Sequence, residues 1–221
     1  MSNIIKTTGD NSPTLFSEKF GVHYHSVHGA MTETEIVFIE TGLRKVAENS
    51  SDINILEVGF GSGLNCFATL KEMELSGYCV FYTALEKYPV DFQTAKNFGI
   101  RLDLNHEDQF LFEKMHEAEW EKKFNIFDRF ALTKMQLDFM NFQANEDFDL
   151  IYFDAFAPET QPELWTVEMF ELMAKALKIG GVLTTYCAKG YVKRNLKAAG
   201  FSIEALPGPP GKREITRATK L

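Results

Sequence analysis

Apolar and polar positions along the 221-residue chain follow two alternating periods. Nearly continuous apolar runs, such as residues 148–153, are typical of strands that are buried on both faces of a sheet. Between them, apolar residues recur every three or four positions, as in the helices that we expect over residues 64–75 and 169–177. Strands are predicted near residues 55–58, 80–85, 130–137, 148–153, 182–187, 201–206 and 214–218, and further helices near 36–46, 89–98, 105–124 and 192–199.

Strands that alternate with helices predict an α/β, Rossmann-like fold with a seven-stranded, mostly parallel sheet. The last two strands are joined by the short loop 207–212, so we expect them to form a C-terminal antiparallel hairpin. The chain length suits one such domain, which we assign to residues 51–221. Residues 1–50 are expected to form an N-terminal cap segment that packs on this domain.

The chain has the features of a cytoplasmic protein. Its first residues are polar, and no apolar run is long enough to span a membrane. The three cysteines form no C-x-x-C pair, so we expect neither disulfides nor a cysteine zinc site. Three histidines lie within six residues but lack neighbours at a familiar ligand spacing, so no metal is expected; they are His23, His25 and His28.

A glycine-rich segment follows the first strand of the domain. Gly59, Gly61 and Gly63 stand at alternate positions after Glu57, and the predicted helix begins directly behind them. A strand, a glycine turn and a helix N-terminus form a nucleotide-binding site. The spacing resembles motif I of class I S-adenosylmethionine methyltransferases more than the dinucleotide pattern G-x-G-x-x-G. Glu86, at the end of the next strand, is placed to bind ribose hydroxyls of either nucleotide.

Two further acidic residues end predicted strands. Asp138 follows the third strand, where it is either a capping residue or, by analogy with class I methyltransferases, a partner of the adenine amino group. Asp154 follows the buried strand 148–153 and is expected at the carboxyl edge of the sheet, beside the glycine loop. We therefore regard Asp154 as the strongest candidate for chemistry.

The charge of the chain is unevenly distributed. The net charge of −8 opposes nucleic-acid binding, which needs clustered Lys and Arg. However, residues 186–221 contain eight basic and two acidic side chains, a net +6, which leaves −14 for the rest. This asymmetry predicts a basic face on an acidic body, although a solvated helix and hairpin would explain much of it.

In their order, several motifs resemble those of one family, the methyltransferase domain of MnmC-type tRNA 5-methylaminomethyl-2-thiouridine biosynthesis proteins. Besides the glycine loop with Asn65, they are residues 9–15, 24–26, 29–30, 154–158, 162–165, 199–201 and 211–214. The resemblance implies methyl transfer from S-adenosylmethionine to the amine of 5-aminomethyl-2-thiouridine at the tRNA wobble position. Bifunctional relatives also have an FAD-dependent oxidase domain that this chain lacks, so we expect no FAD and a possible separate oxidase partner.

The resemblance assigns roles to individual residues. Asp154 would orient the amine and accept its proton, Phe156 would stack on the base, and Pro158 would stiffen the loop. The cofactor-binding residues would be Glu57, Gly59, Gly61, Gly63, Asn65, Glu86 and Asp138. The residues that bind tRNA or its base would be Tyr24, His25, Ser26, Trp165, Lys193, Arg194, Lys212 and Arg213. For Trp165, packing against the following helix is an equally good interpretation.

Other functions remain open at the level of sequence. The same fold could methylate a small-molecule or protein amine, or transfer an aminopropyl group. From a different class, an NAD-dependent oxidoreductase would use the same glycine loop and Glu86. A binding module without turnover is a third alternative.

Overall fold

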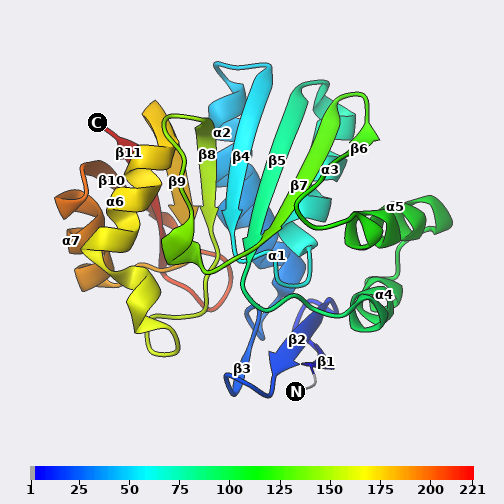
Figure 1. Ribbon diagram of the computed structural model, residues 1–221. Coiled ribbons are helices and arrows are strands. Elements are labelled where there is room, and N and C mark those ends of the chain that lie inside the picture. The colour runs from blue at the N-terminus through cyan, green and yellow to red at the C-terminus, as the bar shows by residue number, and fades with distance from the viewer. Residues whose placement is uncertain (1–2) are drawn as a thin grey trace.

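The predicted apolar runs form the centre of an eight-stranded sheet in the computed structural model, which describes residues 3–221 (Figure 1). The strand order is β10-β11-β9-β8-β4-β5-β7-β6, with β4, β5, β7, β8 and β9 parallel to one another. These strands are β4 (Asp52–Val58), β5 (Cys79–Glu86), β6 (Lys123–Phe127), β7 (Phe130–Gln136), β8 (Phe148–Phe153), β9 (Leu177–Thr185), β10 (Phe201–Pro207) and β11 (Glu214–Lys220). The α/β fold class and the antiparallel β10–β11 hairpin are confirmed.

The eighth strand, β6, was not predicted. The helix expected over residues 105–124 ends at Glu117, and residues 123–127 instead pair antiparallel with β7. Apolar spacing alone does not separate a helix end from a short edge strand. Similarly, the helix expected near residues 89–98 continues to Arg101 as α4 and includes Gly99, where a Cβ atom would approach the Phe112 ring to 2.7 Å. Gly99 thus allows close packing between two helices.

Successive residues of the central strands face two different apolar clusters. Leu150 and Tyr152 of β8 point into one cluster, whereas Ile151 and Phe153 point into the other. Helices therefore cover both faces of the sheet, as strands buried on both sides require. The helical elements are α1 (Ala30–Thr34), η1 (Glu35–Leu43), α2 (Arg44–Ala47), α3 (Leu64–Ser76), α4 (Phe92–Arg101), α5 (His106–Glu117), η2 (Phe139–Asn141), η3 (Pro162–Trp165), α6 (Val167–Ala176) and α7 (Gly190–Ala198).

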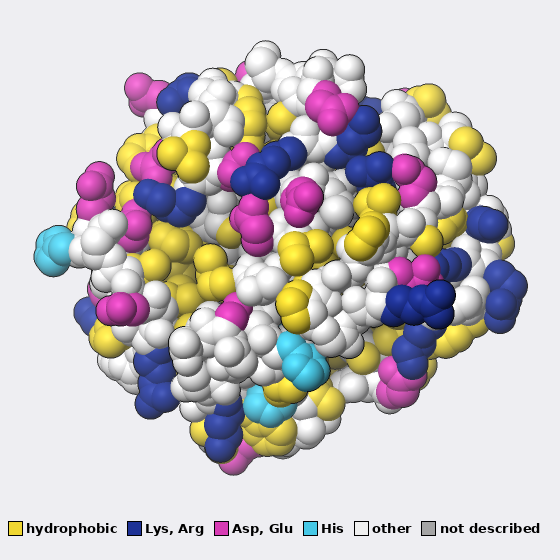
Figure 2. All heavy atoms as spheres, turned by 180° about the vertical axis from the view of Figure 1, so that it is seen from behind, with side chains coloured by type: hydrophobic (Ala, Val, Ile, Leu, Met, Phe, Trp, Pro, Cys, Tyr) yellow, Lys and Arg dark blue, Asp and Glu magenta, His cyan; other side chains and the backbone are white. Residues whose placement is uncertain are grey.

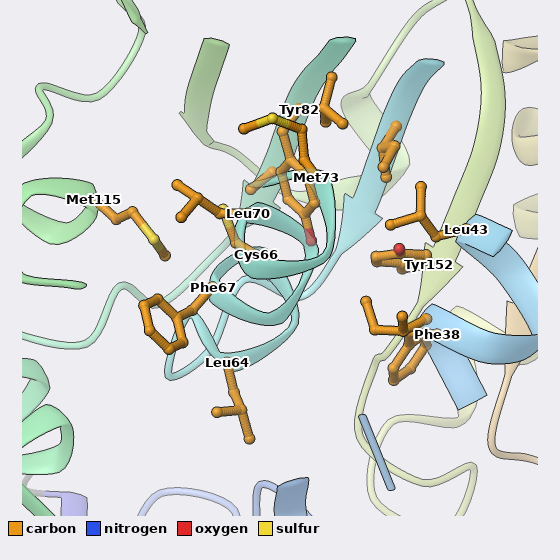
Figure 3. Packing of buried hydrophobic residues seen from close by; sticks show 14 of the residues in the cluster. Phe38, Leu43, Leu64, Cys66, Phe67, Leu70, Met73, Tyr82, Met115 and Tyr152 are labelled. Carbon is orange, nitrogen blue, oxygen red and sulfur yellow. The ribbon is translucent and has the colours of Figure 1, made fainter. Parts of the chain in front are cut away.

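The larger cluster surrounds α3. Figure 3 shows Cys66, Phe67 and Leu70 of this helix between the strands and α5, with Phe38 of η1 facing Tyr152 of β8. The smaller cluster packs α6 and α7 against the opposite face. These two layers hold the sheet rigidly, so that the carboxyl ends of β4, β5 and β8 have fixed positions.

The N-terminal segment has two parts. A separate three-stranded antiparallel sheet consists of β1 (Asn3–Thr7), β2 (Pro13–Ser17) and β3 (Val22–His23), and it lies below the carboxyl ends of the central strands in Figure 1. The helical run 30–47 instead packs on the central sheet, with Val37, Phe38 and Leu43 in the larger cluster. The domain boundary near residue 50 stays a prediction.

Residues 3–221 show neither a membrane-spanning helix nor a metal-binding cluster. None of the helices there combines the length and apolar character that a bilayer crossing requires. The same residues contain no group of three or more His, Cys, Asp or Glu side chains arranged to hold a metal ion.

Candidate active site

Loops at the carboxyl ends of β4 and β8 approach each other closely. The amide of Asp154 donates to the carbonyl of Val58, over 3.0 Å, and Gly59 follows with a φ of +96°. A Cβ atom on Gly59 would lie 2.8 Å from the Asp154 carbonyl oxygen. Glycine is therefore needed here both for its backbone conformation and for the contact between the two loops.

A cavity of about 570 Å³, partly open to solvent, lies where these loops meet. We call it the cofactor cavity. Of the predicted site residues, those that line it are Tyr24, His25, Gly59, Gly61, Asn65, Glu86, Asp154 and Phe156. Residues from four separate parts of the sequence are thus brought to one place.

Glu86 lies at the end of β5 and presents a carboxylate to this cavity. It accepts hydrogen bonds from the backbone amides of Gly61, at 3.1 Å, and Tyr88, at 2.7 Å. Burial nevertheless raises the pKa of Glu86. A carboxylate offers about four acceptor positions, so Glu86 retains the capacity to accept bonds from ligand hydroxyls.

Asn65, in the first turn of α3, links two carboxyl groups. Its Nδ2 donates to Glu57 Oε1 at 3.0 Å and to Asp154 Oδ2 at 2.8 Å. The amide orientation is fixed because Asn65 Oδ1 accepts a 2.8 Å hydrogen bond from the Thr34 hydroxyl. Asn65 therefore acts as a positioning residue for Asp154.

Both carboxyl groups of this network have pKa values above those of free side chains. Burial and the neighbouring Asp154 raise the pKa of Glu57 well above its usual value. Burial and the charge of Glu33 raise the pKa of Asp154 to about 7, although the Asn65 hydrogen bond acts in the opposite direction. A carboxyl group with this pKa can accept and release a proton at neutral pH.

Aromatic side chains close the cofactor cavity. Phe156 lies 4.9 Å from both Phe20 and Tyr24, measured between ring centroids, and Phe20 also lies 5.8 Å from Tyr88. Phe20 belongs to the turn between β2 and β3, so the N-terminal sheet covers the cavity. Sequence analysis did not identify Phe20, Tyr88 or Phe139 as lining residues, because aromatic residues in loops carry no periodic signal.

Comparison with known proteins identifies the family. Residues 109–221 match the model of a family described as S-adenosyl-L-methionine-dependent methyltransferase, which covers about half of the chain. The chain belongs to the S-adenosyl-L-methionine-dependent methyltransferases. This membership confirms the predicted cofactor and decides against the NAD-dependent alternative.

The methyltransferase also resembles individual proteins along nearly its whole length. It is 31% identical to the tRNA 5-methylaminomethyl-2-thiouridine biosynthesis bifunctional protein MnmC of Ralstonia nicotianae and 28% identical to that of Cupriavidus metallidurans. These matches cover 93% and 94% of the chain but only 33% of each relative. The crystal structure of MNMC2 from Aquifex aeolicus matches with a TM-score of 0.79 and 26% identity, over 98% of this chain and 70% of that one. The predicted family resemblance is confirmed.

The residues around the cavity fit S-adenosylmethionine. A side chain at position 61 would narrow the cofactor cavity, since a Cβ atom on Gly61 would lie 3.0 Å from the Tyr24 ring. Glu86 and Asp154 offer negative charge, which suits a sulfonium cation and ribose hydroxyls. The aromatic rings of Phe20, Tyr88 and Phe156 provide apolar walls.

Gly63 faces His116 and Ser26 lines a neighbouring cavity, so neither lines the cofactor cavity. Four further predicted site residues also lie outside its lining. Trp165 is only 1% exposed and donates its indole N–H to the Phe156 carbonyl, so the prediction that it stacks on a base is wrong. Glu57 is fully buried beneath Asn65 and does not line the cavity. Asp138 caps η2 and pairs with Lys87 at the rim, whereas Phe139 lines the cavity. Pro158 is buried in the loop after Asp154.

The predicted basic contacts divide into two kinds. Lys193 pairs with Glu214 at 2.8 Å, and Lys212 pairs with Glu33 at 2.6 Å, so these two ammonium groups already have carboxylate partners. Arg194 and Arg213 are exposed and take part in none of the ion pairs described between residues 3 and 221. On the face that Figure 2 shows, Lys and Arg are interspersed with Asp and Glu.

Proposed function

We propose that this methyltransferase transfers a methyl group to the amine of 5-aminomethyl-2-thiouridine at the wobble position of tRNA, in the cytoplasm. The names of the MnmC relatives support this substrate, and the Aquifex MNMC2 match extends over almost the whole chain. The observation that carries the proposal is Asp154, held by Asn65 at the inner end of the cavity with a pKa of about 7.

The roles of the residues follow from their positions. Gly59, Gly61 and Gly63 form the backbone cradle for S-adenosylmethionine, Asn65 positions Asp154, and Glu86 binds the ribose hydroxyls. When bound, S-adenosylmethionine supplies the electrophilic methyl group. Asp154 orients the acceptor amine and takes its proton, because an alkylamine is nucleophilic only as the free base. Phe156 stacks against the base, since it lines the cavity beside Asp154.

The N-terminal residues Tyr24, His25 and Ser26 close the acceptor side, and Arg194 and Arg213 contact tRNA phosphates. The chain spans a third of the length of the MnmC relatives, which are named bifunctional, and an oxidase would supply the aminomethyl precursor. These assignments place both the donor and the acceptor at one edge of the sheet.

The test is to incubate the purified protein with S-adenosylmethionine and tRNA from a strain that lacks this methyl group, then digest the tRNA and analyse its nucleosides by mass spectrometry. We expect a gain of one methyl on 5-aminomethyl-2-thiouridine. Asp154→Asn should bind S-adenosylmethionine and lose at least about 100-fold in turnover. A wild-type protein that binds the cofactor but leaves this nucleoside unchanged would refute the tRNA substrate.

A further inference from the structure

A second cavity adjoins the cofactor cavity. It has an empty volume of about 440 Å³, including space open to solvent, and shares Tyr24, His25 and Phe156 with the cofactor cavity. Glu33, Tyr186 and Lys212 line it in addition. A ligand in this cavity would contact Phe156, which lies two residues after Asp154 in the same loop.

Its polar centre is a partly buried ion pair. Lys212 Nζ lies 2.6 Å from Glu33 Oε2, and the two side chains are 27% and 5% exposed, respectively. The same ammonium lies 4.0 Å from the centre of the Tyr186 ring. A carboxylate has about four acceptor positions, so one ammonium partner leaves Glu33 able to accept further hydrogen bonds.

Two distant segments place this pair. Glu33 lies in α1, whose first amides are bonded by the side chains of Asp10 and Ser12 from the β1–β2 turn. Lys212 lies in the turn between β10 and β11, next to Gly211, where a Cβ atom would lie only 2.4 Å from the His28 ring. Gly211 therefore lets the hairpin turn reach the N-terminal segment and carry Lys212 to Glu33.

The charge balance of this cavity favours a cation. Burial and Lys212 lower the pKa of His25 to about 4, so this ring is neutral, and burial raises the pKa of Tyr186. Beneath them, the pKa of Glu57 is also raised, which favours its neutral form. The charges of Glu33 and Lys212 in the lining balance, so an ionised Asp154, whose pKa responds to both, leaves a net negative charge next to the cavity.

We propose that this second cavity is the acceptor subsite, that it takes a primary amine as its ammonium form, and that Glu33 is its specificity-determining carboxylate. The inference rests on the proposed function and deepens it. Glu33 holds the ammonium beside Asp154, and Asp154 takes one proton from it. The freed lone pair forms the new N–C bond while the S–C bond of the donor breaks and its electron pair remains on sulfur. The product leaves as a protonated secondary amine.

The test compares Glu33→Gln with Glu40→Gln, a matched change at an exposed position of the same helical run. In methylation of aminomethyl-containing tRNA, Glu33→Gln should raise the KM for tRNA by about 10-fold to 100-fold and leave the Kd of S-adenosylmethionine unchanged. The acidic limb of the pH–rate profile should move to lower pH, because a negative neighbour of Asp154 is lost. Lys212→Met should move the acidic limb to higher pH, because the positive charge that lowers the pKa of Asp154 is lost. Glu40→Gln should behave as wild type.

The double variant Glu33→Gln/Lys212→Met separates recognition from folding. It removes both charges, so thermal stability should recover relative to either single variant while the KM for tRNA stays raised. If wild type methylates the tRNA but Glu33→Gln changes neither the KM nor the pH profile, the acceptor subsite is wrong and the proposed function stands. If the double variant recovers a wild-type KM, Glu33 has only a structural role. If wild type leaves the tRNA unmethylated, both proposals fail.

Discussion

Asp154 is a partly buried carboxyl group in an acidic environment. Asn65 Nδ2 donates a hydrogen bond to its side chain, and Glu33 and Glu57 interact with it electrostatically. Burial disfavours the ionised form, so the pKa rises from an ordinary 3.8 to about 7. The proposed role of Asp154 as a proton acceptor would need the ionised form that burial disfavours, as is common for residues that act on protons.

Asp154→Asn should stabilise the ligand-free protein at alkaline pH. Between pH 3.8 and 7 the folded state keeps the Asp154 proton that the unfolded chain has lost, so wild-type stability falls as the pH rises through this window. At pH 8 the resulting penalty is about 4 kcal/mol, which Asn avoids. Thermal unfolding at pH 5 and pH 8 should show a variant advantage that is larger at pH 8.

Asn125→Asp in β6 offers a contrasting control, because it adds an ionisable group at an exposed position far from the cavity. Its stability relative to wild type should change little between the two pH values. Equal stability differences for Asp154→Asn at pH 5 and pH 8 would contradict the raised pKa.

At the scale of elements, α1 depends on residues outside its own sequence. Its N-cap, Gly29, has no side chain, and the first amides are instead bonded by Ser12 Oγ and Asp10 Oδ2. Burial alone would raise the pKa of Asp10, but hydrogen bonds from Ser12, Thr8 and Thr32 lower it. The segment around Asp10 is thus a remote helix cap. It matters for function because Glu33 and Thr34 both lie in α1.

Asp10→Ala should therefore impair both stability and turnover. We expect a loss of about 2 kcal/mol in the free energy of unfolding, because several hydrogen bonds to one carboxylate disappear. Turnover should also fall by about 10-fold, since α1 no longer fixes Thr34 and through it Asn65. Denaturant unfolding and steady-state methylation assays measure the two effects.

Asp91→Ala is the matched control for this element. Asp91 caps α4 through the amide of Thr94, at 2.9 Å, and has no bond to the Asn65 network among residues 3–221. Asp91→Ala should lower the free energy of unfolding by about 1 kcal/mol and leave turnover near the wild-type rate. Comparable losses of turnover in both variants would show that capping affects activity only through general stability.

For the whole molecule, the distribution of charge decides how an acidic protein could bind RNA. Several basic side chains of the C-terminal region are held by nearby carboxylates, among them Lys189, Lys193, Lys212, Arg217 and Lys220. These pairs reduce the basic character that the sequence suggested. Long-range attraction to phosphate then depends on exposed cations outside these pairs, such as Arg194 and Arg213.

The double variant Arg194→Glu/Arg213→Glu should raise the KM for tRNA by about 10-fold or more at low salt and leave cofactor affinity unchanged. The effect should diminish as salt increases, because phosphate contacts weaken with counterion concentration. Arg129→Glu is the control, since Arg129 lies in the β6–β7 turn at the other edge of the sheet. An equal effect of Arg129→Glu would indicate non-specific charge repulsion instead of a defined contact.

Several site residues were predictable because local chemistry marks them. Gly59 and Gly61 stand in a spacing that requires a turn, and Glu86 and Asp154 are carboxylates at strand ends. Glu33 and Thr34 had no such signal, because their partners Lys212 and Asn65 are 179 and 31 positions away in the sequence. Trp165 was ambiguous, since an aromatic residue near a loop suits both stacking and packing.

The sequence by itself determined the α/β class, the parallel core and the glycine loop, because hydrophobic periodicity and turn residues act over short distances along the chain. Only the tertiary structure decided which polar groups meet. Asn65 joins Glu57 to Asp154, α1 brings Glu33 to the hairpin, and Phe20 closes the cavity from the N-terminal sheet. These contacts depend on how distant segments pack in three dimensions, and periodicity along one chain contains no record of that packing.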